Sequence, residues 1–425
     1  MSSKYTILRL SLVAFILFGL LSLFSRVRNV SAYDIAPTKT PTKTPTKTPT
    51  KTPTKTSTPT KTPTKTPTPT KTKTPTSTPT NFYPYPPPIP GTPNAQLTYH
   101  FFLPIVQKPY VDMSYYLVTT DNLYGLGYKR GQAYEFQPVA QDGIVILDFG
   151  SPYYYNGNYG VILLDYINWP VVRFIPEIKD SLKQFAEGYW DGLGSDNISF
   201  ITVVVGTNSV GSHVTHEHGA EWGTMINELN SWLASQGYNG QIRFVGGSDI
   251  ETGVDFRPPI EARAWVDGFT STGWPEGSLL YNYGTAGGCP LDYPYTEPEI
   301  QYPWNITPQD CDANGWTQED VYHVSWGSLS AYPFPEIYNT QGANANQWYR
   351  IALYAQFEHG NRMEFRGTLA TYTACLQLQD PCTGYNNTAL DAHVQLLIAL
   401  SSDPYDRVDE PLYWISDLMW YFGNP

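Results

Sequence analysis

Two short apolar runs decide the predicted fold: Ile-Val-Ile-Leu-Asp-Phe at residues 144–149 and Phe-Ile-Thr-Val-Val-Val at residues 200–205. Neither run alternates apolar with polar residues. A strand without that alternation is buried on both faces, which is typical of a parallel sheet covered by helices. Further runs of this kind follow along the chain. The other predicted strands are Ile242–Val245, Ser278–Tyr283, Val321–Trp326, Glu336–Tyr338 and Met363–Leu369.

Segments of helical period lie between or after these runs. In each segment the apolar residues recur three or four positions apart, so that they share one face of a helix. Thr388 followed by Asp391 resembles a capping box at the start of the last helix. The four predicted helices contain residues Ile178–Tyr189, Trp222–Leu233, Trp348–Ala355 and Val394–Ile398.

The alternation of strand and helix predicts an α/β fold, a (β/α)₈ TIM-barrel-like domain that is irregular in places. An open doubly wound sheet is the alternative, but no Gly-x-Gly-x-x-Gly motif for a dinucleotide follows a strand. Gly160–Asp165 is an ambiguous further strand, and the eighth strand is not located. His100–Tyr110 reads as an edge strand that leads into the domain. Pro411–Phe422, too short to span a membrane, is predicted to pack on the barrel as a closing helix.

Residues 1–32 predict export. Lys4 and Arg9 precede an uninterrupted apolar run, Leu10–Phe24, which is the order of a secretory signal. Val30–Ala32 offers a cleavage site, although two arginines stand between the run and that site. The segment is therefore a cleaved signal peptide or a retained signal anchor. In both cases we expect the protein to be secreted or to face the outside of the cell membrane, with membrane contact only through this segment.

Residues 33–94 predict a disordered linker. From Pro37 to Thr80 the chain repeats Pro-Thr-Lys-Thr with almost no apolar side chain, a composition that favours extended polyproline II structure. The linker is either a spacer that lifts the following domain away from a charged cell envelope or a passive connection. Residues 95–425 form the predicted folded domain.

Charge is unevenly distributed along the chain. The formal net charge is −12, yet the first 80 residues are basic and the remainder is strongly acidic. Phosphate would be repelled by such a body, so the composition predicts no nucleic-acid partner. Aromatic residues make up 15% of the chain, with 33 Tyr and 12 Trp, which is ample material for a core.

Four cysteines form an even set, which in an exported chain predicts disulfides. Three pairings are possible. We favour the two local ones, Cys289 with Cys311 and Cys375 with Cys382, because each would close a long polar or Pro-rich loop. None of the spacings matches a Cys-x-x-Cys metal site.

In a barrel, functional groups lie at the carboxyl ends of the strands, where the loops that lead into the helices gather. Asp148, Asp249 and Glu251 are the predicted catalytic residues at these ends. The predicted substrate-binding residues at the other strand ends are Asn208, Asn282, Tyr283, Trp326, Tyr338 and Glu364.

Asp249-Ile250-Glu251 is the sharpest local signal, directly after a predicted strand. Residues two apart on a strand point to the same side, so each carboxyl would raise the proton affinity of the other. A carboxylic acid that keeps its proton near neutral pH can protonate a glycosidic oxygen.

This Asp-x-Glu resembles barrel glycoside hydrolases of the lysozyme and chitinase types, and the resemblance extends from Asp148 to about Leu400. It implies that Glu251 is the acid, that Asp249 is its partner and that Asp148 is a second carboxylate near the scissile bond. Chitinase-type enzymes carry further aspartates upstream in the same strand, whereas Gly247 and Val245 stand here.

Two structural interpretations stand beside these functional ones. The two carboxylates of Asp-x-Glu would cap the following segment or pair with Arg257 or Arg263. His213, His216 and His218 have poor spacing for tetrahedral coordination, so we expect them to cap a helix or line a cleft. The sequence predicts no metal site and no cofactor. Aromatic residues in the loops suit either stacking on sugar rings or packing together, and include Tyr153, Tyr154, Tyr155, Tyr159, Trp169, Trp274, Trp304 and Tyr332.

Taken together, these patterns predict an exported glycoside-hydrolase-like protein that acts on a polysaccharide or peptidoglycan by general acid catalysis. The partner would be a carbohydrate polymer or cell-wall glycan. The alternative is a catalytically inactive barrel that binds carbohydrate or has a structural role at the cell surface. No Gly-x-Ser-x-Gly elbow and no phosphate-binding Gly-rich loop supports an acyl hydrolase or a nucleotide-binding protein.

Overall fold

The computed structural model describes residues 110–165, 170–272, 278–291, 309–311, 314–378, 381–403, 408 and 412–425. The chain divides into two units, Met1–Leu97 and Thr98–Pro425, and all described residues belong to the second. The predicted signal or anchor (1–32), the predicted linker (33–94) and the aromatic residues Trp169, Trp274 and Trp304 lie outside the described residues.

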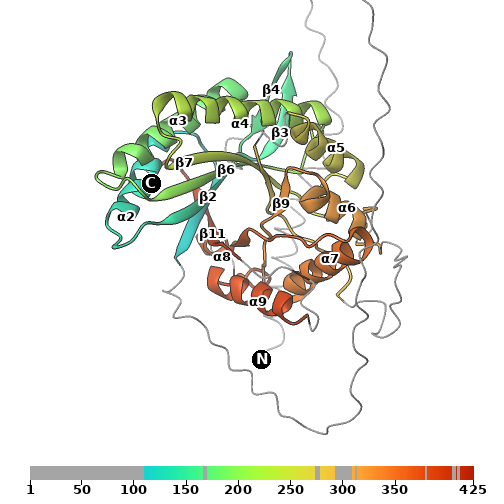
Figure 1. Cartoon of the computed structure of the whole chain (residues 1–425). Helices are drawn as coiled ribbons and strands as arrows, with labels where there is room; N and C mark the ends of the chain where they lie inside the picture. The colour runs from blue at the N-terminus through green and yellow to red at the C-terminus, as the bar shows by residue number, and fades with distance from the viewer. Residues whose placement is uncertain are drawn as a thin grey trace, which may run out of the picture. The chain divides into compact units, whose positions relative to one another are not determined.

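An eight-stranded parallel sheet forms the centre of the second unit (Figure 1). Its strand order is β10-β11-β1-β2-β6-β7-β8-β9. The two edges are joined by one parallel bridge between Glu336, which follows β9, and Leu369 on β10, so the sheet curls into a nearly closed ring. The strands are β1 (Val111–Leu117), β2 (Asp142–Asp148), β6 (Phe200–Asn208), β7 (Ile242–Asp249), β8 (Leu280–Asn282), β9 (Ala331–Pro333), β10 (Gly367–Ala370) and β11 (Trp414–Tyr421).

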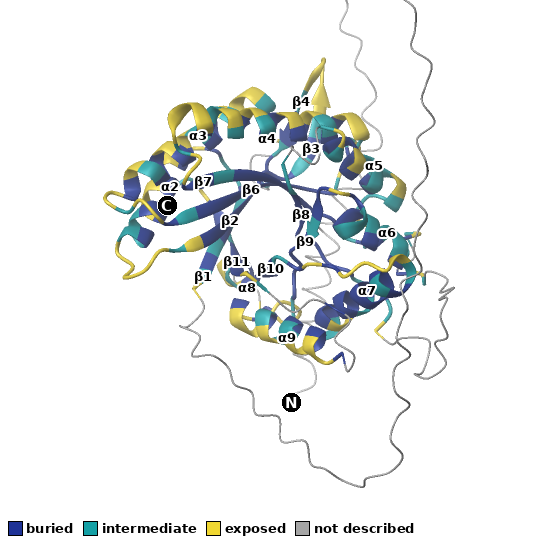
Figure 2. Cartoon of the chain, viewed as in Figure 1, coloured by how far each residue is buried: buried dark blue, intermediate teal, exposed yellow. Residues whose placement is uncertain are grey.

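Helices surround the ring on its outside (Figure 1). The strands are mostly buried, and the helices bury the face turned toward them (Figure 2). This arrangement is an irregular (β/α)₈ barrel, as the sequence predicted. The helices are α2 (Leu123–Glu135), α3 (Ile175–Gly192), α4 (His216–Gln236), α5 (Pro259–Thr270), α6 (Gln318–Tyr322), α7 (Ala343–His359), α8 (Tyr372–Gln377) and α9 (Ala389–Ser401).

A small antiparallel sheet interrupts the barrel between β2 and α3. It has the order β3-β4-β5, with β3 (Ser151–Tyr155), β4 (Asn158–Ile162) and β5 (Val172–Phe174). The ambiguous strand at Gly160–Asp165 therefore overlaps β4, outside the barrel sheet. Among the described helices, none has the length and apolar character needed to cross a bilayer.

Two predicted strands are absent from the structure. Val321–Trp326 is helical instead, spanning α6 and a π-helical turn at His323–Gly327, because Thr317 and Asp320 form a capping box that starts a helix. Glu336–Tyr338 contributes only the bridge from Glu336. The predicted edge strand at His100–Tyr110 falls outside the described residues apart from Tyr110.

The last run of the chain was also predicted wrongly. Pro411–Phe422 is not a closing helix: from Trp414 it forms β11, which lies between β10 and β1. Almost every β11 residue is buried, so the run has no alternation that would distinguish a strand from a short helix. Three strands of the barrel, β1, β9 and β11, were not predicted as strands. β1 carries a buried Asp112 that interrupts its apolar pattern, and β9 has only three residues.

The four predicted helices are confirmed, as is the capping box of Thr388 and Asp391. On α9, however, Val394 and Ile398 are exposed, and the helix packs through Ala392, Leu396 and Leu400 instead. Both expected disulfides are present, and they join Cys289 to Cys311 and Cys375 to Cys382.

Candidate active site

Asp249 is the last residue of β7, and Glu251 follows it by two positions at the carboxyl end of the barrel. The backbone carbonyl of Asp249 accepts a hydrogen bond from the amide of Ser209, which follows β6 (2.9 Å). The Glu251 amide donates to the Ser209 hydroxyl (3.4 Å). Contacts to the neighbouring strand thus hold both residues of the Asp-x-Glu motif in place.

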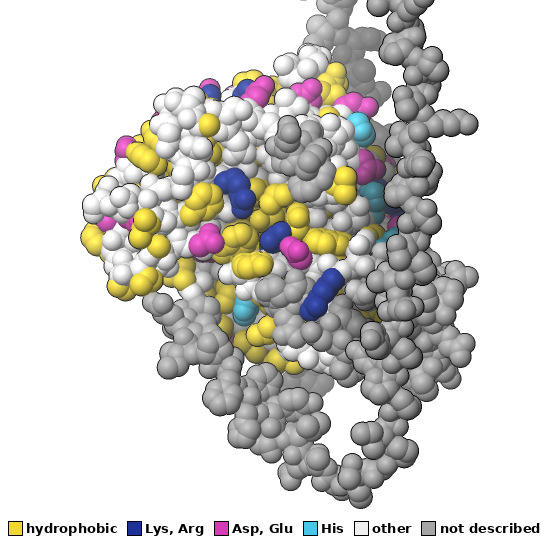
Figure 3. Space-filling model, in the orientation of Figure 1, with side chains coloured by type: hydrophobic (Ala, Val, Ile, Leu, Met, Phe, Trp, Pro, Cys, Tyr) yellow, Lys and Arg dark blue, Asp and Glu magenta, His cyan; other side chains and the backbone are white. Residues whose placement is uncertain are grey.

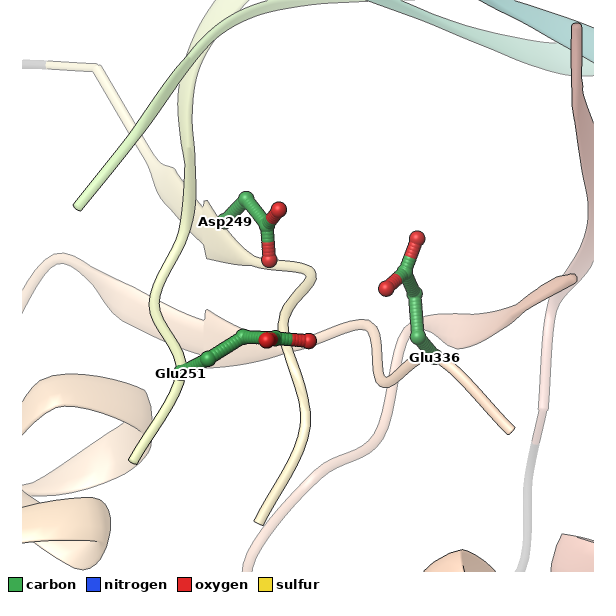
Figure 4. Close-up of side chains that lie close together, drawn as sticks. All are labelled: Asp249, Glu251 and Glu336. Carbon is green, nitrogen blue, oxygen red and sulfur yellow. The ribbon is translucent and has the colours of Figure 1, made fainter. Parts of the chain in front are cut away.

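A third carboxylate joins this pair. Glu336 comes from the segment after β9, and one carboxylate oxygen from each of Asp249, Glu251 and Glu336 lies within 4.8 Å of the others. Figure 4 shows the three side chains converging from two separate parts of the chain. The sequence pattern does not point to Glu336, because this residue stands at the start of a predicted strand rather than at a strand end. The available signal was a single carboxylate within the apolar run Ala331–Tyr338.

Hydroxyl groups donate to two of the three carboxylates, Glu251 and Glu336. The Tyr338 hydroxyl donates to Oε1 of Glu251 at 2.5 Å, and the Thr285 hydroxyl donates to the same oxygen at 3.3 Å. The Tyr116 hydroxyl donates to Oε1 of Glu336 at 3.4 Å. Asp249 Oδ1 and Glu336 Oε2 are buried and have no hydrogen-bond partner among the described residues.

No ion pair within the described ranges involves these carboxylates, so the predicted pairing of Asp249 or Glu251 with Arg257 or Arg263 is wrong. Arg257 pairs with Glu261, and Arg263 pairs with Asp320. Both arginines are thereby engaged elsewhere.

Burial and mutual repulsion raise the pKa values of the cluster. Burial raises the pKa of Asp249 well above its usual value, and the charges of Glu251, Glu336 and Asp148 raise it further. Burial likewise raises the pKa of Glu336 far above normal. The pKa of Glu251 is also raised by burial, although the hydrogen bonds from Tyr338 and Thr285 oppose this rise. All three carboxyls therefore bind a proton more strongly than isolated carboxyl groups do.

Asp148 lies next to this cluster but outside it. It is the last residue of β2, is completely buried, and accepts a hydrogen bond from the amide of Gly150 (2.7 Å). Its other oxygen has no partner among the described residues. Burial raises the pKa of Asp148 to about 6.

The predicted residues Asn208, Asn282 and Tyr283 do lie at the carboxyl ends of β6 and β8, but their polar atoms bind the protein. Asn208 accepts from the Ser151 hydroxyl (3.3 Å), and Asn282 donates to the Ser325 hydroxyl (2.8 Å). The Tyr283 hydroxyl donates to a backbone carbonyl (3.0 Å). These contacts brace the strand ends around the carboxylates.

Trp326 and Glu364 are not at this end of the barrel. Each precedes its strand: Trp326 comes before β9 and packs edge-on against Tyr332 (5.2 Å between ring centroids), and Glu364 comes before β10. Chain segments that lead into parallel strands gather at the amino ends of those strands. The predicted placement of these two residues at strand ends is wrong, because Val321–Trp326 is not a strand and because the strand predicted at Met363–Leu369 begins at Gly367.

The histidines do not form a metal site. His218 is completely buried on α4, its Nε2 donates to the carbonyl of Gly160 (2.8 Å), and its Nδ1 accepts from the indole of Trp265 (2.9 Å). Burial lowers the pKa of His218 to about 4, so the ring is neutral at pH 7. Both ring nitrogens are occupied, and Thr215 rather than a histidine caps α4.

Asp249, Glu251 and Glu336 could together offer three oxygen ligands to a divalent cation, since hard cations prefer carboxylates. The same three groups could also carry out proton transfer and nucleophilic chemistry at one bond. An experiment can distinguish metal binding from metal-free proton transfer, because only metal binding depends on a divalent cation.

Comparison with known proteins yields little. No protein-family model matches the chain, and no curated protein sequence matches it. Among solved structures, the chain is similar to an endo-1,4-beta-mannanase from Rhizomucor miehei, with 10% sequence identity and a TM-score of 0.32, over 73% of this chain and 85% of that one. The fold assignment therefore rests on the strand order and closure described above.

Proposed function

We propose that the protein hydrolyses glycosidic bonds in a polysaccharide or in peptidoglycan, with Glu251 as the general acid. The observation that carries this proposal is the convergence of Glu251 with Glu336 and Asp249 at the carboxyl end of the barrel, within 4.8 Å and without a cation among the described residues. Glu251 has a raised pKa and is the member of the cluster with partial exposure to solvent. It can therefore hold a proton near neutral pH and deliver it to a bound sugar.

Glu336 takes the place that the sequence assigned to Asp148, as the second carboxylate. In retaining enzymes the two carboxyl groups lie about 5–5.5 Å apart, and in inverting enzymes about 6.5–9.5 Å apart. The short spacing here favours retention. Glu251 would protonate the leaving oxygen while Glu336 attacks the anomeric carbon and the C–O bond breaks. Glu251 would then take a proton from the water that cleaves the glycosyl ester.

Asp249 and Tyr116 would control the charge on Glu336. The Tyr116 hydroxyl donates to Glu336, which favours its ionised form, whereas Asp249 has a buried oxygen without a partner and is better suited to hold a proton. Asp148, behind them, adds negative charge that raises the pKa of both Asp249 and Glu336.

The two disulfides are compatible with the oxidising surroundings of an exported protein. Secretion or anchoring through residues 1–32, display on the linker 33–94 and a carbohydrate polymer as partner belong to the same proposal.

A catalytically inactive barrel that binds carbohydrate or has a structural role is the second candidate. The burial of the cluster favours it: Glu336 is 0% exposed and Asp249 is 6% exposed. Carboxyls that never meet a substrate would stay protonated and hydrogen-bonded within the barrel.

One assay separates the two candidates. The purified full-length chain is incubated with a panel of polysaccharides and with peptidoglycan, and new reducing ends are measured. We expect hydrolysis, and we expect Glu251→Gln to reduce it by about 10²–10⁴-fold, the usual contribution of a general acid. Glu187→Gln, at an exposed position on α3, is the matched control and leaves the rate unchanged.

Three outcomes contradict the proposal in different ways. Absence of hydrolysis on every substrate favours the inactive barrel. Hydrolysis that survives Glu251→Gln removes Glu251 from the role of acid. Hydrolysis that is abolished by a chelator and restored by a divalent cation means that the three carboxylates hold an ion instead.

A further inference from the structure

A cavity of about 570 Å³ opens at the amino ends of the strands, at the end of the barrel opposite to the carboxylate cluster. Its walls include the first residues of β2, β6 and β11 and residues near the starts of β7 and β10. Adjacent strands bring these positions into register, since Asp142 pairs with Phe200 and Thr202 pairs with Arg243. The residues that matter here are Asp142, Thr202, Arg243, Arg366, Tyr413 and Trp414.

Arg243 is the first unusual feature of this cavity. No acidic side chain in the described ranges lies within 4.0 Å of its guanidinium, although the body of the chain is strongly acidic. Its described side-chain hydrogen bond is a long one, 3.4 Å to the Thr202 hydroxyl. Its Nε is buried without a hydrogen-bond partner among the described residues. A guanidinium so placed has donors to spare for an anion.

Arg366 is the second cation on the wall. It pairs with the exposed Glu364 at 3.1 Å, and its guanidinium lies over the ring of Tyr332, 4.1 Å from the centroid. Its Nε is also buried without a partner among the described residues. The contact with the Tyr332 ring and the ion pair with Glu364 hold this guanidinium at the cavity wall.

The rest of the lining suits a ring that carries hydroxyl groups. Tyr413 is 59% exposed at the cavity, and Trp414 and Phe200 add further aromatic surface. Gln141 and Asp142 provide acceptors for hydroxyl groups next to these rings. In Figure 3, basic and acidic side chains lie side by side over the centre of the barrel, with hydrophobic side chains around them.

We propose that this cavity binds a sugar acid, a hydroxylated ring that carries one carboxylate. The carboxylate would bind the guanidinium of Arg243, with Arg366 nearby, and the face of the ring would stack on Tyr413. A monoanion fits better than a phosphate dianion, because Asp142 and Glu364 flank the arginines with negative charge. The site is independent of the proposed hydrolytic function at the other end of the barrel.

Calorimetric titration of the purified full-length chain tests the proposal, with D-galacturonate as the probe. We expect binding of galacturonate and at least tenfold weaker binding of galactose, acetate and galactose 1-phosphate. Arg243→Met should weaken galacturonate binding at least tenfold, and Arg243→Lys should weaken it less. Glu251→Gln, at the carboxylate cluster, should leave binding unchanged, so a failure here is distinct from a failure of the proposed hydrolysis.

A second variant covers the case in which Arg243→Met does not fold, as judged by its thermal unfolding. Tyr413→Ala changes an exposed side chain and should weaken galacturonate binding while leaving the unfolding temperature nearly unchanged. Three results overturn the proposal: no binding of galacturonate at millimolar concentration, equal binding of acetate, or binding that neither variant alters.

Discussion

Asp148, Asp249 and Glu336 are buried carboxyl groups that no cation neutralises in the described part of the chain. Burial of an ionised carboxylate is costly, so the pKa of each of these three groups is raised above its usual value. Such groups cluster at functional sites because reactivity there requires perturbed pKa values. His218 shows the structural counterpart: it is equally buried, but both of its ring nitrogens are hydrogen-bonded.

Asp148→Asn should make the protein more stable at neutral pH. The pKa of Asp148 is raised to about 6 in the folded state, so the protonated carboxyl favours the folded state. This contribution to the free energy of unfolding is fully present at low pH and is lost as the pH rises through 6. A difference of one pKa unit between the folded and unfolded states changes the free energy of unfolding by about 1.4 kcal/mol. Asparagine keeps the acceptor for the Gly150 amide and has no charge to bury. Between pH 4.5 and 7.5 the variant should gain about 2 kcal/mol over the wild type in urea unfolding.

The matched control is Asp180→Asn, at an exposed position on α3. It should show no comparable gain. A constant difference between Asp148→Asn and the wild type over this pH range would contradict the assignment of Asp148 as a buried carboxyl with a raised pKa.

At the scale of elements, α2 and α3 approach each other through glycines. Each helix carries two of them four residues apart, and a Cβ at any one would lie within 2.3 Å of a backbone oxygen of the other helix. On α3, Gly188 faces the carbonyl of Tyr124 and Gly192 faces that of Tyr128. Because glycine has no side chain, the backbones of α2 and α3 lie in direct contact at these positions. α2 follows β1 directly, so this contact holds the first strand of the barrel in place.

Gly188→Ala should therefore destabilise the protein. Alanine has the higher helix propensity, by about 1 kcal/mol, but its Cβ would lie 2.0 Å from the Tyr124 oxygen and would force the helices apart. Overpacking of this kind costs about 1–3 kcal/mol, and more where backbone must move, so we expect a net loss in chemical denaturation. Glu187→Ala, at the exposed neighbouring position, should change stability little. A more stable Gly188→Ala protein would show that α2 and α3 are not in close contact.

At the scale of the whole molecule, the barrel is completed by the two ends of the folded unit. β1 pairs with β11 along its entire length, from Val111 with Ile415 to Leu117 with Tyr421. The hydroxyls of Ser114 and Ser416 lie 2.7 Å apart within this pair. The ring therefore forms only when nearly the whole domain is present, which makes chain connectivity important for stability.

The two disulfides should contribute unequally to this stability. Cys289–Cys311 spans 22 residues and Cys375–Cys382 spans 7. From the loop-closure entropy of the unfolded chain, we expect removal of the first to cost about 3 kcal/mol and removal of the second about 2 kcal/mol. Unfolding of the Cys289→Ala/Cys311→Ala and Cys375→Ala/Cys382→Ala proteins measures both. A larger loss from the second pair would contradict an entropic origin.

Local sequence was sufficient for the elements whose pattern reflects their burial. The runs at 144–149 and 200–205 became β2 and β6, and the strand end at Asp249 and Glu251 was placed at the correct edge of the barrel. Helix periodicity identified α3 and α4 because each has one exposed face and one buried face, whereas α7 is buried on most of its circumference. Local disulfide pairings followed from short separations along the chain.

Long-range contacts were needed for the rest. β11 is a strand because β10 and β1 supply hydrogen-bond partners on both sides, and nothing within Trp414–Tyr421 distinguishes it from a helix. Glu336 joins Asp249 and Glu251 because curling of the sheet brings the segment after β9 across from β7. Arg243 and Arg366 meet at one cavity for the same reason. The hydrophobic period of a segment indicates which of its residues are buried, whereas closure of the barrel determines which residues far apart in the sequence come into contact.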